Sequence, residues 1–152
     1  MTPVRTTVMT TLLTALDTIT ELKTVKRFEP VPTDLSTIPT PACFVYDSVA
    51  EQLQKNNLFM RVEAEMNIRV YISLTQKDAS LGNVPFNDQA DDIQAKIHAA
   101  LHSQIPDATG IFEDIVDQSS EREVPNSDWG ILTYTILVKY RHKFGDGFAT
   151  GT

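Results

Sequence analysis

The stretch FMRVEAEMNIRVYISLT, residues 59–75, alternates apolar and polar side chains at every second position without a break. A period of two is typical of a strand with one buried face, so this stretch predicts a single very long strand. Such a strand would be about 45 Å long if straight, whereas a compact chain of 152 residues is only about 40 Å across. The strand must bend or leave the body, and we expect that a lone subunit cannot shelter all of its apolar face, so that identical copies of the protein cover the rest.

Apolar spacing elsewhere predicts two helices and a second long strand. Apolar residues at steps of three and four predict one helix over residues 4–23 and another that is capped by Asn87 or Asp88. Alternation with a period of two predicts the second long strand at residues 129–141. Shorter strands are predicted at residues 24–30, 42–46 and 111–116.

The remaining segments are predicted to lack regular structure. Prolines predict an irregular connector at residues 30–41, and polar residues predict connections at 47–57 and 118–128. We expect a mobile, glycine-rich tail from about residue 142. The order of elements predicts an α+β fold, with one mainly antiparallel sheet of long strands packed against two helices. We expect one domain over residues 1–152.

The composition excludes several classes of protein. A net charge of −7 argues against binding to nucleic acid through its phosphates, which needs clustered lysine and arginine. Cys43 is the only cysteine and lies in an apolar run, so we expect a buried thiol and no intrachain disulfide. No stretch has the pattern of a secretory segment or a membrane helix. We therefore expect a soluble protein that remains in a reducing cytoplasm.

The strongest enzyme-like pattern is a pair of histidines, His98 and His102, on one side of the second helix. Two such imidazoles can share a zinc ion, but the zinc hydrolase motif HExxH needs a glutamate where this chain has Ala99. The sequence places no further cysteine or histidine nearby, so we expect solvated histidines. We predict no catalytic residues, no metal site and no cofactor, and we keep a metal-dependent enzyme only as an alternative hypothesis.

Several segments together resemble the tail terminator proteins of long-tailed bacteriophages. These segments are TPACFVYDSVAEQL, FMRVEAEMNIRVYISLT, DDIQAKIHAAL, GIFEDIVD and WGILTYTILVKYRH. The resemblance covers nearly the whole chain and consists of element order and apolar spacing. It depends most on the short strand that ends at Tyr46 before the long strand, and on the final strand of the form LTYTILVKYR.

This resemblance implies a structural protein with no active site. Six copies would form a ring at the head-proximal end of the tail tube of the virion. The ring would end tube polymerisation and join the tail to the head-side connector or stopper protein. DNA would pass through it without sequence-specific binding, which an acidic ring favours because it repels phosphate. A head-completion or stopper ring at the neck of the same particle is the alternative. We expect the chain to be synthesised in the host bacterial cytoplasm, with no membrane partner.

One face of the first long strand is the candidate subunit interface. Its residues are Arg61, Glu63, Glu65, Arg69 and Tyr71, which share the polar face of that strand. Opposite charges there would fix the register between neighbouring copies. The alternative is that these residues are solvated on an exposed sheet face.

Overall fold

The computed structural model describes residues 2–27, 38–55, 59–74, 85–104, 112–125, 128–143 and 146–150. Two helices and six strands lie within these ranges. In chain order they are α1 (Val4–Asp17), β1 (Thr24–Arg27), β2 (Ala42–Lys55), β3 (Phe59–Ser73), α2 (Phe86–Gln104), β4 (Phe112–Glu123), β5 (Trp129–Lys143) and β6 (Asp146–Thr150).

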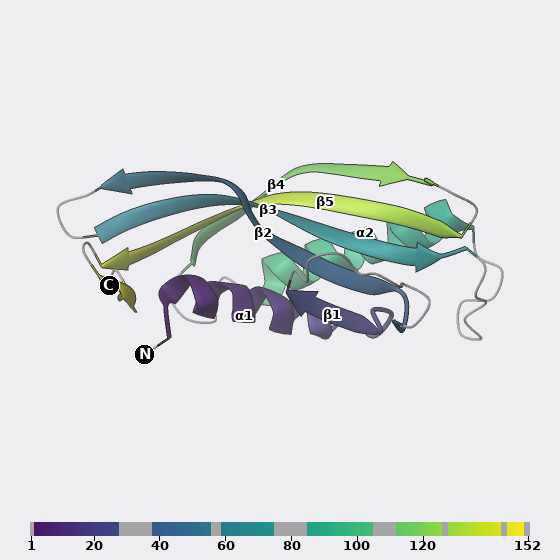
Figure 1. Cartoon of the computed structure of the whole chain (residues 1–152), viewed down its shortest axis with the longest axis horizontal. Coiled ribbons are helices and arrows are strands. Elements are labelled where there is room, and N and C mark those ends of the chain that lie inside the picture. The colour runs from purple at the N-terminus through teal and green to yellow at the C-terminus, as the bar shows by residue number, and fades with distance from the viewer. Residues whose placement is uncertain are drawn as a thin grey trace.

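The strands form one sheet, and both helices pack on the same face of it (Figure 1). The strand order is β1-β2-β3-β5-β4, with β6 also paired to β5. All of the pairings are antiparallel except the one between β1 and β2. The predicted α+β fold, with a mainly antiparallel sheet against two helices, is confirmed.

The two long strands pair along their whole length. Phe59 of β3 lies opposite Lys143 of β5, and the register continues without interruption to Ser73 opposite Trp129. Both strands were predicted from their alternation, and both are confirmed. Figure 1 shows that the strands twist about one another near the middle of the sheet, so the long strands bend as twisted sheets do.

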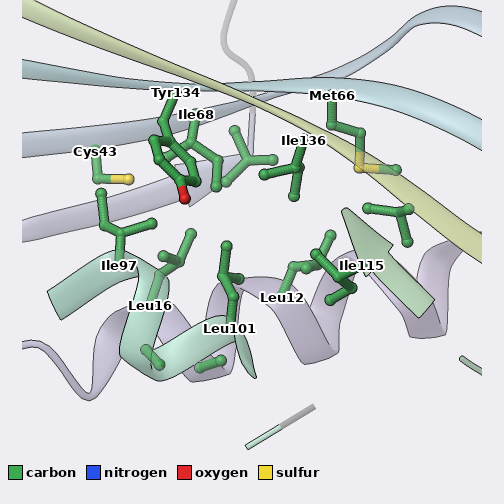
Figure 2. Close-up of a cluster of buried hydrophobic side chains, with 14 of the residues drawn as sticks. Leu12, Leu16, Cys43, Met66, Ile68, Ile97, Leu101, Ile115, Tyr134 and Ile136 are labelled. Atoms are coloured by element: carbon green, nitrogen blue, oxygen red, sulfur yellow. The ribbon is translucent and has the colours of Figure 1, made fainter. Parts of the chain in front are cut away.

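We call the sheet face that carries α1 and α2 the inner face, and the opposite one the outer face. The inner residues of β3 and β5 form the floor of the main core (Figure 2). They are Val62, Ala64, Met66, Ile68, Val70, Ile72, Leu132, Tyr134, Ile136, Val138 and Tyr140, and all are buried. The helices cover them with the apolar side chains of Val4, Val8, Leu12, Leu16, Ala90, Ile93, Ile97 and Leu101.

The chain therefore covers the apolar faces of its own long strands. The expectation that a neighbouring copy must cover them is wrong, because helix packing within one chain removes these side chains from water. The end of the sheet formed by the β2–β3 hairpin extends past the start of α1 in Figure 1. Only Leu53 among the apolar side chains described there is strongly exposed, at 61%.

β2 is longer than the sequence predicted. We expected a strand only at 42–46 and a polar connection at 47–57, but β2 continues to Lys55. The polar composition of this stretch hid its strand character, because the strand is stabilised by backbone pairing with β3. A bulge between Tyr46 and Ala50 interrupts the register and marks where the predicted strand ended.

β4 is longer than predicted for the same reason. We expected a strand at 111–116 followed by a charged loop at 118–128, but β4 continues to Glu123 and pairs with β5 throughout. Its distal half is almost entirely exposed. An exposed edge strand has no buried face to produce alternation, so the sequence carried no period-two pattern there.

The helix boundaries also differ from the prediction. α1 ends at Asp17, and Ile19 and Leu22 of the predicted stripe are buried from the turns that follow it. The end tightens into hydrogen bonds from residue i to residue i−3, which terminates the helix. α2 begins before Asn87 and Asp88, so these two residues lie in its first turn and do not cap it.

The predicted mobile tail from about residue 142 is partly wrong. Residues 142 and 143 belong to β5, and residues 146–150 form β6, because backbone pairing with β5 orders them. Most of the predicted 30–41 connector lies outside the described residues. No helix among the described residues is long and apolar enough to cross a membrane.

Gly130 allows the start of α2 to lie against β5. A Cβ atom at Gly130 would be 2.4 Å from ring carbons of Phe86, so we expect Gly130→Ala to lower the free energy of unfolding by about 1–3 kcal/mol through overpacking. Urea denaturation measures this loss.

In a Phe86→Ala background, the loss of stability caused by Gly130→Ala should be smaller, because the Phe86 ring is absent. Gly147→Ala is the control: nothing lies within 4 Å of that Cβ position, and we expect little or no loss of stability. Equal costs for Gly130→Ala in the two backgrounds would contradict this account.

Candidate functional site

The residues predicted at a subunit interface all lie on the outer face of the sheet. Arg61, Glu63, Glu65, Arg69 and Tyr71 alternate along β3 with the buried inner residues. Among the described residues no helix covers this face, since α1 and α2 both lie on the other side (Figure 1). Most outer residues of β3 and β5 are half-buried by their cross-strand neighbours. The structure therefore gathers the predicted residues on a face that a partner can reach.

Two of the predicted charges already have partners in the same chain. The Arg61 Nε atom lies 2.7 Å from a Glu113 carboxylate oxygen of β4, and Lys139 of β5 lies 3.8 Å from Glu63. Half-exposed pairs of this kind contribute roughly 0.2–1 kcal/mol each. Their main effect is to hold the charged side chains in fixed positions over the outer face.

Tyr71 and Arg69 belong to a small aromatic cluster at the other end of the outer face. Tyr71 is only 8% exposed and meets the Phe44 ring edge-on at 5.9 Å. The Arg69 guanidinium lies 4.8 Å from the centre of the Tyr46 ring. Burial and a hydrogen bond with Tyr71 raise the pKa of Tyr46 to about 12. Tyr71 thus stabilises its own subunit, and little of its side chain is available to a neighbour.

Glu65 differs from the other four residues. Its cross-strand neighbours are Ala50 and Leu137, neither of which carries a charge. Among the described residues its carboxylate has no ion pair or side-chain hydrogen bond. Glu65 is therefore the predicted interface residue whose charge remains available to a partner.

Among the described residues, the sheet has two edge segments, on opposite sides, that pair with no further strand. β1 pairs with β2 only at Ala42–Val45, so residues 50–54 of β2 pair with β3 alone among the described strands. On the other side, β4 pairs with β5 alone. Both segments leave backbone N–H and C=O groups pointing outward, as in any strand at the edge of a sheet.

His98 and His102 lie on one side of α2, as predicted, and are partly exposed, but both also contact a carboxylate. The Nδ1 atom of His98 lies 2.8 Å from one oxygen of Asp117, and the Nε2 atom of His102 lies 2.9 Å from the same oxygen. The two rings are tilted by 43° to each other, with centroids 4.5 Å apart. The Tyr134 hydroxyl lies 3.4 Å from His98 Nδ1. Helix α2 therefore presents both imidazoles to one carboxylate on β4.

Sequence analysis missed Asp117, which lies between the strand predicted at 111–116 and the connection predicted at 118–128. Burial alone would raise the pKa of the Asp117 carboxyl, but hydrogen bonds from Tyr134 and His102 outweigh it and hold that pKa below its usual value. Burial and the neighbouring Asp117 raise the pKa of Tyr134. The carboxylate is thus kept charged beside two imidazoles.

A comparison with models of known protein families finds no matching family, and a search of curated proteins finds no match to this sequence. The class of the protein is therefore given by its fold, a two-layer α+β domain whose two described helices lie on one face of the sheet. Its function is inferred below from that geometry and from the resemblance described above.

Substitutions on the outer face should differ in their effect on the free energy of unfolding. Residues that stabilise the subunit should lower it when replaced, and residues available to a partner should not. We expect Phe44→Ala to cost about 2–4 kcal/mol of unfolding free energy, because Phe44 is 3% exposed and packs on Tyr71. Glu65→Ala should change it by less than about 0.5 kcal/mol. Urea denaturation of the dilute protein measures both. A large loss in Glu65→Ala would show that the chain itself uses this carboxylate.

Proposed function

We propose that the protein is a structural ring subunit that terminates the tail tube of a long-tailed bacteriophage at its head-proximal end. The proposal joins the resemblance to tail terminator proteins with one observation: on opposite sides of the subunit, two sheet edges pair with no further strand in the described part of the chain. The neck ring of the same particle is the alternative, since a head-completion or stopper protein needs the same kind of assembly.

Opposite edges support a ring because they are different surfaces. A contact between residues 50–54 of one copy and β4 of the next is heterologous, and repeated heterologous contacts close into a ring when the rotation between copies allows it. Main-chain hydrogen bonds would join the two edges, as in strand addition to a sheet. A single sheet would then continue from one subunit into the next.

The side chains near the edges would restrict this pairing to the correct neighbour. β4 carries Asp114, Glu121 and Glu123 on its outer side, and all three are exposed. Charged edge strands resist indiscriminate pairing, because like charges on approaching strands repel. Ring closure therefore needs complementary charges from the neighbour.

The net charge suits a conduit for DNA. At −7 per chain, a ring of six copies would carry about −42 from the sequence alone. Phosphate would be repelled by such a ring, which favours passage over binding. The tail tube protein and the head-side connector would be its protein partners.

Cross-linking tests whether the two edges meet in a heterologous contact. Cys43 is buried and should not react with the cross-linker, so only the introduced cysteines should form cross-links. We expect a Gln54→Cys/Ser119→Cys variant, treated with a flexible bismaleimide under assembly conditions with tail tubes, to give a ladder of covalent oligomers ending at the ring number. Each single variant should give dimers at most, since a heterologous contact brings the two different positions together. Denaturing gel electrophoresis measures the products.

The matched control is Gln54→Cys/Thr14→Cys, whose second cysteine lies on the exposed side of α1. It should give no ladder. Ladders of equal length from both double variants would indicate collisional cross-linking and would remove the support for edge pairing.

Addition of the protein to growing tail tubes tests termination itself. We expect the wild-type chain to narrow the distribution of tube lengths and to add density at one tube end in negatively stained images. For Glu65→Lys, the protein concentration needed to narrow the tube lengths should rise at least about tenfold, because the substitution reverses the available charge on the outer face. Asp17→Lys makes the same charge change on exposed α1 and should act as wild type. Unchanged tube lengths with no end density would overturn the proposal, whereas density at the neck of assembled particles and none on free tubes would favour the stopper alternative.

A further inference from the structure

A row of polar contacts joins helix α2 to the edge strand β4. Arg122 of β4 binds the side chains of Asp91 and Gln94 on α2. Further along the same seam, His98 and His102 of α2 meet Asp117 of β4. These α2 residues follow one another at steps of three or four, so they share one side of the helix. The seam thus has an ion pair at one end and a histidine–carboxylate cluster at the other.

A bulge in β4 gives the seam its geometry. Asp117 and Arg122 are five positions apart, and in a regular strand they would point to opposite faces. Asp117 lies opposite Ile136 of β5, whereas Ser119 lies opposite the adjacent Thr135, so β4 contains one extra residue at this point. Because of the extra residue, Arg122 points to the inner side of the sheet as Asp117 does, and α2 lies on that side.

We propose that His98, His102 and Asp117 form a binding site for one divalent transition-metal cation of the zinc class. Two imidazole nitrogens converge on one carboxylate oxygen at 2.8 and 2.9 Å. One potential ligand atom from each of the three residues lies within 4.8 Å of the others. Two imidazoles and one carboxylate are a donor set that proteins use for zinc and related cations.

Side-chain rotations have to adjust the spacing before it can hold a cation. Ligand atoms of a tetrahedral zinc ion at about 2.0–2.1 Å are about 3.4 Å apart. The widest pair must therefore approach by up to about 1.4 Å, and each imidazole nitrogen must move about 0.5 Å away from the shared Asp117 oxygen. The side chains of His98, His102 and Asp117 are 57%, 34% and 29% exposed, so they have room to rotate. Their exposure also leaves at least one coordination position open to water.

The surroundings of Asp117 support a cation more than a simple hydrogen-bonded cluster. The Oδ2 atom of Asp117 lies within 2.9 Å of a nitrogen of each imidazole. The other carboxylate oxygen, Oδ1, is shielded from solvent and has no hydrogen-bond partner. A carboxylate with an unused, buried oxygen is able to accept a second bond from a cation. Tyr134, which hydrogen-bonds the carboxylate, would hold it in orientation as second-layer partners do in metal sites.

A cation in this position would connect α2 to the free edge of the sheet. Among the described strands β4 pairs only with β5, so a bond from Asp117 through a cation to α2 would add a restraint that this backbone pairing does not supply. The inference does not depend on the proposed ring, because all three residues come from one chain and lie on the inner side of the sheet.

Zinc and cobalt binding to the purified chain without a polyhistidine tag tests the site. We expect one equivalent of Zn²⁺ by titration calorimetry, a higher melting temperature with Zn²⁺ than with EDTA, and visible absorption bands when Co²⁺ is added. His98→Ala and His102→Ala should each weaken Zn²⁺ binding at least about tenfold, and the double variant should abolish it. Asp117→Asn should also weaken it at least about tenfold and should shift or remove the Co²⁺ bands.

His142→Ala is the matched control. The chain has three histidines, and the third, His142, contacts the Lys143 carbonyl on β5; its loss should leave Zn²⁺ affinity unchanged. Circular dichroism of every variant checks that the fold is retained. Binding that persists in the double histidine variant, or that is undiminished in folded Asp117→Asn, would overturn the three-residue site. Absence of both a melting shift and Co²⁺ bands in the wild type would overturn the proposal entirely.

Discussion

The uninterrupted pairing of β3 with β5 is the constraint on which the rest of the structure depends. Fifteen residues of each strand lie in one register, so every inner side chain of one strand sits beside an inner side chain of the other. A slip of one residue would move all of these apolar groups to the outer face. The two helices can then pack only on the inner face, because only this face of the sheet is apolar enough to cover the apolar sides of the helices.

The amount of structure that the sequence predicts follows burial. β3, β5 and the two helices each bury one regular face, and their alternation or three-and-four spacing was sufficient to locate them. The distal halves of β2 and β4 bury little, so their strand conformation depends on a partner strand that no local pattern reveals. Mispredicted boundaries therefore concentrate at the sheet edges, which are also the surfaces that the ring proposal uses.

The two candidate sites differ in the same way. Arg61, Glu63, Glu65, Arg69 and Tyr71 share a face because a strand alternates, and this was predictable from one segment of sequence. The cluster of His98, His102 and Asp117 requires helix α2 to lie beside strand β4, so that side chains from two elements that are distant in sequence meet. Two histidines at helical spacing indicated half of the cluster, and the other half came from tertiary structure.

Because the subunit buries its own apolar faces, any assembly has to be driven by groups that a single subunit leaves in water. Backbone edges and exposed charges give weaker, more directional contacts than apolar surface, and separate subunits lose little by remaining apart. An assembly of this kind forms readily on a template that brings several edges together at once, because neighbouring contacts then act as a multivalent set. Under the proposed function, the end of a tail tube would be such a template. A subunit that is stable alone and joins its neighbours only there would end a tube without forming stray rings elsewhere.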